Sequence, residues 1–152
     1  MMEWFVTSFL KAALAWLALA TLLGLGMILH PAWLVYRPAH LHMTLLGFVT
    51  MTISGVAYHV IPRFTGHPLA SRRAAGAHFW FANGGLAVMV VGFWLQGSAS
   101  TAWQVVLGIG GVLSTIGVFL FVTTLWRTID GPRGAPSPRP ALPGARRMPV
   151  QP

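Results

Sequence analysis

The side chains of this chain best suited to chemistry are its six histidines, three of which, His30, His40 and His42, lie close together in the sequence. The chain has no Cys, and its only acidic residues, Glu3 and Asp130, lie outside the long apolar stretches. These facts exclude disulfides, thiolate metal sites and covalent haem attachment through Cys-x-x-Cys-His, and they argue against proton relays through buried carboxylates. The functional prediction therefore rests on histidine.

His40 and His42 form a His-x-His pair at the start of a predicted helix. At about 100° per residue, two side chains at this spacing point roughly 200° apart. They cannot bind one small metal ion from the same helical face, which weakens a zinc-type reading. They suit two partners on opposite faces, such as two cofactors, or a cofactor and a neighbouring subunit. Haem fits this arrangement, because neutral imidazole binds its iron axially and its apolar ring packs between helices.

The elements that must position these residues are predicted by hydropathy. Of the 152 residues, 55% are hydrophobic and 8% are charged, whereas soluble domains carry about 25% charged residues. Four apolar stretches reach the roughly 20 residues that a membrane-spanning helix needs. We therefore expect an all-α integral membrane protein, a four-transmembrane-helix bundle in residues 1–130, with spans at about 4–29, 39–62, 77–95 and 103–126.

Residues 131–152 differ in composition, with seven Pro and four Arg. Such a segment cannot bury a core, and we expect a disordered Pro/Arg-rich tail whose Arg side chains are attracted to anionic lipid. A nucleic-acid partner is not expected, because the cations are few, dispersed and not interleaved with aromatic residues.

The ten cations predict the topology. Lys11, Arg63, Arg72, Arg73, Arg127 and the four Arg residues of the tail fall on one side, and Arg37 alone falls on the other. Because Lys and Arg are retained on the cytoplasmic side, both termini are expected to be cytoplasmic, in a bacterial-type inner membrane. A cleaved signal peptide is the alternative reading of the first stretch, but that stretch is long and lacks a basic start. His30, His40 and His42 then lie at the outer face.

Small residues recur in the last two spans at the spacing of helix contacts, which predicts close packing of helices in lipid. They are Gly84, Gly85 and Gly92 in the third span, and Gly110, Ser114 and Gly117 in the fourth.

A longer pattern surrounds the histidine pair. Ala39-His40-Leu41-His42 is followed by Gly55, Tyr58-His59, Pro62, Phe64-Thr65-Gly66 and Leu69. This stretch resembles the tenth helix of heme-copper oxidase subunit I, and the next span, which opens His78-Phe79-Trp80-Phe81, is similar to the eleventh helix of that family. The same stretch, with Leu46-Gly47-Phe48, is also similar to membrane haem proteins of the NnrS type.

The resemblance implies non-covalent b-type haem. His40 matches the axial ligand of the high-spin, gas-binding haem, and His42 matches one ligand of the low-spin haem. His59 and His78 match residues that are not ligands, and His67 reads as a polar loop residue. The missing axial ligand would be His30 or a histidine from a second copy in a two-fold dimer, and Arg37 is the natural partner of the haem propionates.

The departures from the family limit the expected activity. The chain lacks the three copper-ligating histidines, the cross-linked tyrosine and the low-spin ligand of earlier helices. It also lacks the arginine pair that binds propionates, because Gln96-Gly97-Ser98-Ala99-Ser100-Thr101 stands in that place. We expect no catalytic residue and no complete oxidase in this chain alone, but at most a subunit of an oxidoreductase.

Three functions follow from these observations. The leading one is a membrane b-type haem protein that transfers electrons or binds a diatomic gas such as nitric oxide or oxygen. The second is a cofactor-free accessory or assembly subunit of a respiratory or denitrification complex. The third is a copper-handling protein that uses the outer histidines with Met27 or Met43, although copper as a cofactor is not expected. The expected partners are the lipid bilayer and either further copies of the chain or other respiratory-type subunits.

Overall fold

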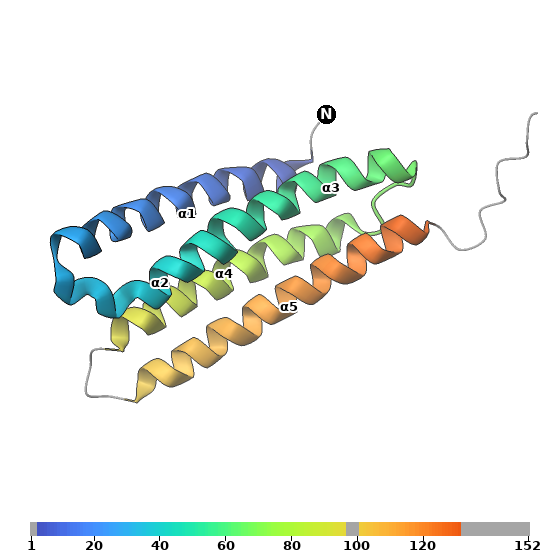
Figure 1. Cartoon of the computed structure of the whole chain (residues 1–152). Coiled ribbons are helices and arrows are strands. Elements are labelled where there is room, and N and C mark those ends of the chain that lie inside the picture. Colours follow the sequence, from blue (N-terminus) through green and yellow to red (C-terminus); the bar gives the residue numbers. More distant parts are fainter. Residues whose placement is uncertain (1–2, 97–100, 132–152) are drawn as a thin grey trace, which may run out of the picture.

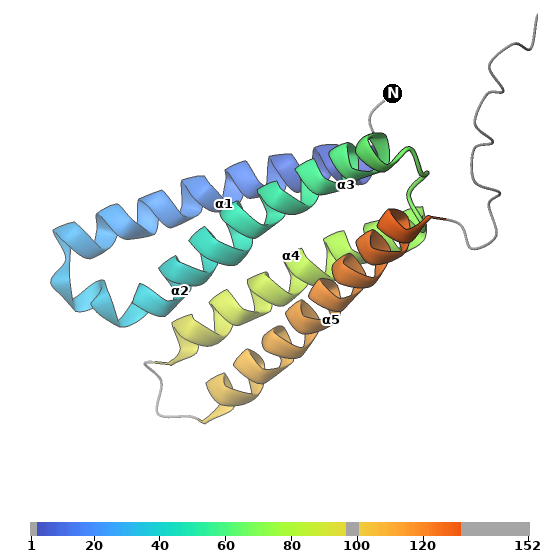
Figure 2. The same ribbon diagram turned by 45° about the vertical axis from the view of Figure 1, so that its right-hand side comes forward.

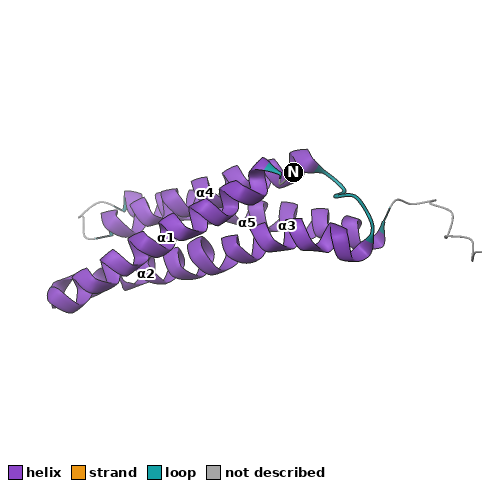
Figure 3. Cartoon of the chain, turned by 90° about the horizontal axis from the view of Figure 1, so that it is seen from above, coloured by secondary structure: helices purple, strands orange, loops and turns teal. Residues whose placement is uncertain are grey.

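The fold is a bundle of long helices. The computed structural model describes residues 3–96 and 101–131, and the regular structure in these residues is entirely helical (Figure 3). Four stretches are long and apolar enough to cross a membrane: Trp4–Leu29, Pro31–Thr65, Arg72–Leu95 and Ala102–Asp130. The prediction of an all-α bundle with four membrane-spanning helices is confirmed.

The helices form two antiparallel pairs. Helix α1 (Trp4–Leu29) lies beside the second span, and α4 (Arg72–Leu95) lies beside α5 (Ala102–Asp130) (Figures 1 and 2). We call the end of the bundle that holds residues 30–42 the histidine end, and the opposite end, which holds Glu3, Arg63 and Arg72, the arginine end. Helix α1 begins and α5 ends at the arginine end (Figure 1). The membrane side that this end faces stays a prediction, and the predicted tail, apart from Gly131, lies outside the described residues.

The second span is one helical rod with three kinds of turn. It starts with a 3-10 helix, η1 (Pro31–Tyr36), continues as α2 (Arg37–His42) and a π-helix, η2 (Met43–Thr50), and ends as α3 (Met51–Thr65). A π-helix bonds each residue to the fifth one before it, and the Thr50 hydroxyl likewise donates to the Leu45 carbonyl oxygen at 2.8 Å. The wider turns begin directly after His42.

Two connections are shorter than the sequence predicted. Residues 30–38 were expected to be a loop, but η1 and the start of α2 fill this stretch, because Pro31 and Pro38 fit the first positions of helices. Helix α4 begins at Arg72 and not at residue 77, because Ser71 caps it: its hydroxyl oxygen accepts from the Ala74 N–H at 3.1 Å. Helix α3 continues past Pro62 and ends at Gly66, whose φ of 69° is left-handed.

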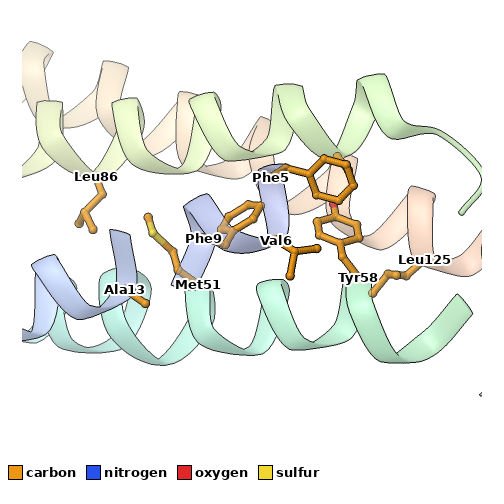
Figure 4. Close-up of a cluster of buried hydrophobic side chains, with 9 residues drawn as sticks. Phe5, Val6, Phe9, Ala13, Met51, Tyr58, Leu86 and Leu125 are labelled. Carbon is orange, nitrogen blue, oxygen red and sulfur yellow. The ribbon is translucent and has the colours of Figure 1, made fainter. Parts of the chain in front are cut away.

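The core lies where α1 crosses the second span and α4. Phe5 and Phe9 of α1 pack with Tyr58 and Met51 of the second span and with Leu86 of α4 (Figure 4). A second apolar cluster lies at the histidine end and contains Ala20, Leu23, Ala39, Met43 and Phe93. Large apolar side chains also cover the outside of the bundle, such as Ile28, 77% exposed, and Phe119, 65% exposed. This surface is suited to contact with lipid tails.

Helices α4 and α5 approach each other closely at glycine. A Cβ atom on Gly85 would lie 2.6 Å from the backbone nitrogen of Ser114 and 2.9 Å from the carbonyl oxygen of Gly110. Only glycine permits this distance between the two backbones. Gly84 has the opposite environment, because nothing lies within 4 Å of its Cβ position. The packing role predicted for Gly85 is confirmed, and the one predicted for Gly84 is wrong.

Candidate functional site

His40 faces α1. Its Nδ1 atom lies 2.9 Å from the carbonyl oxygen of Ala20, and its ring lies against Gly24. A Cβ atom on Gly24 would come within 3.1 Å of His40 Cε1, so the missing side chain lets α1 approach the imidazole. The His40 ring is therefore held between its own helix and the half of α1 that lies at the histidine end.

His42 faces α4. Its ring centroid lies 5.0 Å from that of Phe93, with 44° between the ring planes. Its Nδ1 atom lies 2.8 Å from the carbonyl oxygen of Pro38, one turn earlier in α2. The two histidines thus contact different neighbouring helices, as the angle between their positions predicts.

The hydrogen bonds of both imidazoles select one tautomer of the neutral ring. A carbonyl oxygen accepts hydrogen bonds and cannot donate them, so Nδ1 of His40 and Nδ1 of His42 each carry the proton. In the neutral ring the lone pair then lies on Nε2, which is the form that binds a metal. A hydrogen bond from Nδ1 to a carbonyl also fixes the ring orientation and raises the basicity of the ligand nitrogen. The donor chemistry of both residues fits haem iron.

Apolar hollows adjoin the pair. One, of about 270 Å³, is lined by His42 with Leu41, Leu45 and Leu46, all from the second span. Another, of about 300 Å³, lies between α1 and α4 at the histidine end, and the three tryptophans Trp16, Trp33 and Trp94 contribute to its wall. These volumes fall at or just below the lower end of the range for ligand pockets. The apolar surface of a macrocycle ligated by His42 would suit the hollow that His42 lines. The opposite face of the macrocycle would have to be covered by another molecule.

The other two predicted site residues lie at the same end but are exposed. His30 ends α1, and its ring centroid lies 5.5 Å from that of Trp33. Arg37 is the first residue of α2. Within residues 3–96 and 101–131 no group of three or more His, Cys, Asp or Glu is arranged to hold a metal ion. His30, His40 and His42 are therefore not gathered into one such group.

The sequence interpretation missed a buried polar pair in the other half of the bundle. The hydroxyl of Tyr58 and Nδ1 of His78 form a hydrogen bond of 3.0 Å, and the two residues are 3% and 2% exposed. The His78 ring centroid lies 4.7 Å from that of Phe9. A signal was present, because Met51, Ser54 and Tyr58 recur at the spacing of one helix face. His67, predicted to be a polar loop residue, makes a tertiary contact: its Nδ1 lies 3.2 Å from the carbonyl oxygen of Thr128.

Comparisons with known proteins match most of the bundle to one family. Residues 6–106 match the family described as cytochrome C and quinol oxidase polypeptide I. The chain is similar to the cbb3-type cytochrome c oxidase subunit CcoN1 of Stutzerimonas stutzeri, with 26% identity over 121 residues that cover 63% of this chain and 26% of that protein. It is also similar to cytochrome c oxidase subunit 1 of Thermus thermophilus, with 36% identity over 63 residues that cover 40% of this chain and 56% of that one. No solved structure matches the chain.

Proposed function

Since this chain belongs to the cytochrome c and quinol oxidase polypeptide I family and is a multi-pass membrane protein, we propose that it binds non-covalent b-type haem at its histidine end. The role of the bound haem is electron transfer or the binding of a diatomic gas such as nitric oxide or oxygen. The chain covers 26% and 56% of the lengths of the two relatives, so this proposal concerns the fragment of the family fold that is present.

The proposal rests on a hydrogen bond that both imidazoles make in the same way. Each Nδ1 donates to a backbone carbonyl oxygen, that of Ala20 for His40 and that of Pro38 for His42, which leaves Nε2 available as a ligand. The two rings contact α1 and α4 respectively, so each would serve a different haem or a different neighbour. Bound haem supplies one-electron transfer when both axial positions are filled, and gas binding when one is open.

The other residues receive supporting roles. Arg37, exposed at the start of α2, is the proposed partner of a propionate, because a guanidinium pairs with a carboxylate through two parallel hydrogen bonds. His30, or a histidine of a second copy, is the proposed second axial ligand. The same proposal includes an inner-membrane location with both termini cytoplasmic. It also includes assembly with a second copy or with other respiratory-type subunits. Either kind of neighbour would cover the hollow beside His42.

The test is optical spectroscopy of the full chain, purified in detergent after expression with adequate haem supply. A pyridine haemochrome assay counts and identifies the haem, and reduced-minus-oxidised and carbon monoxide difference spectra report its axial ligands. His40→Ala and His42→Ala should each remove or shift a haem band, whereas His59→Ala, a histidine near the arginine end, should leave the spectra unchanged. A spectrum insensitive to carbon monoxide would favour electron transfer. Haem-free wild-type protein would overturn the proposal.

A second candidate function is a cofactor-free accessory or assembly subunit of a respiratory or denitrification complex. It is favoured by the small share of the CcoN1 relative that the chain covers and by a hollow whose lining comes from one span alone. This candidate predicts haem-free protein that co-purifies with oxidase-type subunits. It also predicts that His40→Ala and His42→Ala leave that co-purification unchanged.

A further inference from the structure

A further hollow lies at the arginine end and takes no part in the proposed haem site. It measures about 290 Å³ and lies where α1 begins, α3 ends and α4 begins. Its polar lining comes from Glu3, His59, Arg63 and Arg72, and its apolar lining includes Val6 and Leu69. Tyr58 also contributes to the wall, so the hollow reaches from the surface to the buried core of the bundle.

The charges around this hollow are unbalanced. Arg72 forms an ion pair with Glu3, the only ion pair in the part of the chain that the structure describes. Arg63 donates to the carbonyl oxygen of His59 in its own helix, and it forms no ion pair within residues 3–96 and 101–131. Two guanidinium groups against one carboxylate leave the lining with a formal excess of one positive charge.

The start of α4 adds to this positive potential. Arg72 and Arg73 occupy its first two positions, and its first turn holds no acidic residue. The N-terminus of a helix carries a partial positive charge, which favours anions and disfavours cations. Arg72, which lines the hollow, is therefore at an electrostatic cost here, and an anion bound in the hollow would offset this cost.

The chemistry of the lining selects the anion. A guanidinium presents parallel N–H donors that match phosphate oxygens, and the apolar wall at Val6 and Leu69 suits the hydrocarbon next to such a group. The hollow lies where three membrane-spanning segments begin or end, which is the depth of lipid headgroups. Basic pockets between transmembrane helices at this depth bind anionic lipid headgroups.

We propose that Arg63 and Arg72 bind a phosphate group in this hollow, supplied by an anionic phospholipid of the surrounding leaflet. Glu3 competes with the phosphate for Arg72 and so limits the affinity. Phosphate binding in this hollow depends on the helix ends and charges at the arginine end, so it is independent of haem binding at the histidine end.

The experiment compares retention of phosphatidylglycerol and phosphatidylcholine by the full chain in detergent, measured by native mass spectrometry over a lipid titration. We expect retention of phosphatidylglycerol in preference to phosphatidylcholine. Arg63→Gln and Arg72→Gln should each weaken phosphatidylglycerol binding about fivefold, the effect of one arginine near a lipid surface. Glu3→Gln should strengthen it. Circular dichroism of each variant verifies the helical fold, which substitutions at the exposed Arg63 and Arg72 and at the half-buried Glu3 should leave intact.

The matched control is Arg73→Gln, which removes the same charge from the same turn of α4 but from a residue that does not line the hollow. It should change binding less than about twofold. Equal losses in Arg63→Gln, Arg72→Gln and Arg73→Gln would show that only the overall positive charge matters and would overturn the site. Equal retention of the two lipids would also overturn it.

A last experiment adds millimolar inorganic phosphate to the lipid-bound protein. Displacement of the lipid by phosphate would support the phosphate site and make a soluble phosphate its source, whereas undisturbed lipid binding supports the phospholipid.

Discussion

The phenolic oxygen of Tyr58 lies 3.0 Å from Nδ1 of His78, and this hydrogen bond joins the second span to α4 inside the bundle. Phe9 and Phe121 surround the pair, with ring centroids 4.7 and 5.3 Å from that of His78. No buried side-chain nitrogen or oxygen among the described residues lacks a hydrogen-bond partner. Each of the two polar groups is therefore needed to satisfy the other.

Removal of the Tyr58 hydroxyl should lower the free energy of unfolding. We expect Tyr58→Phe to cost about 1 kcal/mol, because it leaves a buried imidazole nitrogen without its partner. A double-mutant cycle with His78→Leu, measured by denaturant titration in detergent, gives the coupling energy of the pair. Tyr36→Phe is the control, since Tyr36 stacks on Trp94 with 4.8 Å between centroids and should change stability by less than about 0.5 kcal/mol. Strictly additive effects of Tyr58→Phe and His78→Leu would contradict the coupling.

Two adjacent glycines should respond oppositely to the same substitution. Gly85→Ala places a Cβ atom within 2.6 Å of the α5 backbone and should destabilise the protein by about 2 kcal/mol. Gly84→Ala meets nothing within 4 Å and should be neutral or stabilising by up to about 1 kcal/mol, because alanine favours the helix. Unfolding of both variants in the same detergent provides the comparison, and a Gly85→Ala variant as stable as Gly84→Ala would contradict the close approach of α4 and α5 at Gly85.

The protonation form of the two site histidines is measurable without any cofactor. In protein labelled with ¹⁵N-histidine, the neutral rings of His40 and His42 should both show a protonated Nδ1 and an unprotonated Nε2. Gly24→Val should shift the His40 signals and leave those of His42 in place, because the three atoms nearest to a Cβ on Gly24 all belong to the His40 ring. A proton on Nε2 of either residue in its neutral form would remove the basis of the proposed ligand roles.

The end of α3 depends on the backbone of one residue. Gly66 has a φ of 69°, and nothing lies within 4 Å of its Cβ position, so any cost of substitution is conformational. Gly66→Ala should lower the free energy of unfolding by about 1 kcal/mol, and Gly66→Asn should cost less, because asparagine tolerates the left-handed region. Gly108→Ala, a substitution in an open position of α5, serves as the comparison and should cause no loss.

The four spans were predictable because one property, the length of each apolar stretch, determines whether a helix crosses a bilayer. The helix ends were less predictable. Helix α4 begins at Arg72 because Ser71 caps it, and η1 begins at Pro31 because proline fits a helix start. Both residues lie outside the apolar stretches, so hydropathy alone does not predict these helix starts.

The candidate site was also predictable only in part. The opposite directions of His40 and His42 follow from α-helical geometry over two residues, and the structure places them against different helices. The spacing of Met51, Ser54 and Tyr58 indicates a buried face of α3, but the partner of Tyr58 depends on the rotation of α3 relative to α4, and eight π-helical residues precede α3. The charged hollow likewise requires three chain segments that are distant in sequence to meet at one end.

The π-helical stretch Met43–Thr50 separates the histidine pair from Tyr58 within a single rod. Each residue turns an α-helix by roughly 100°, and the wider turns of a π-helix by somewhat less, so one residue more or less in this stretch rotates one half of the rod against the other by about a quarter of a turn. The number of residues between the histidine pair and Tyr58 thus determines the direction in which His40 and His42 point relative to the core around Tyr58. Relatives with the same two histidines but a different count in this segment would present them to different neighbours.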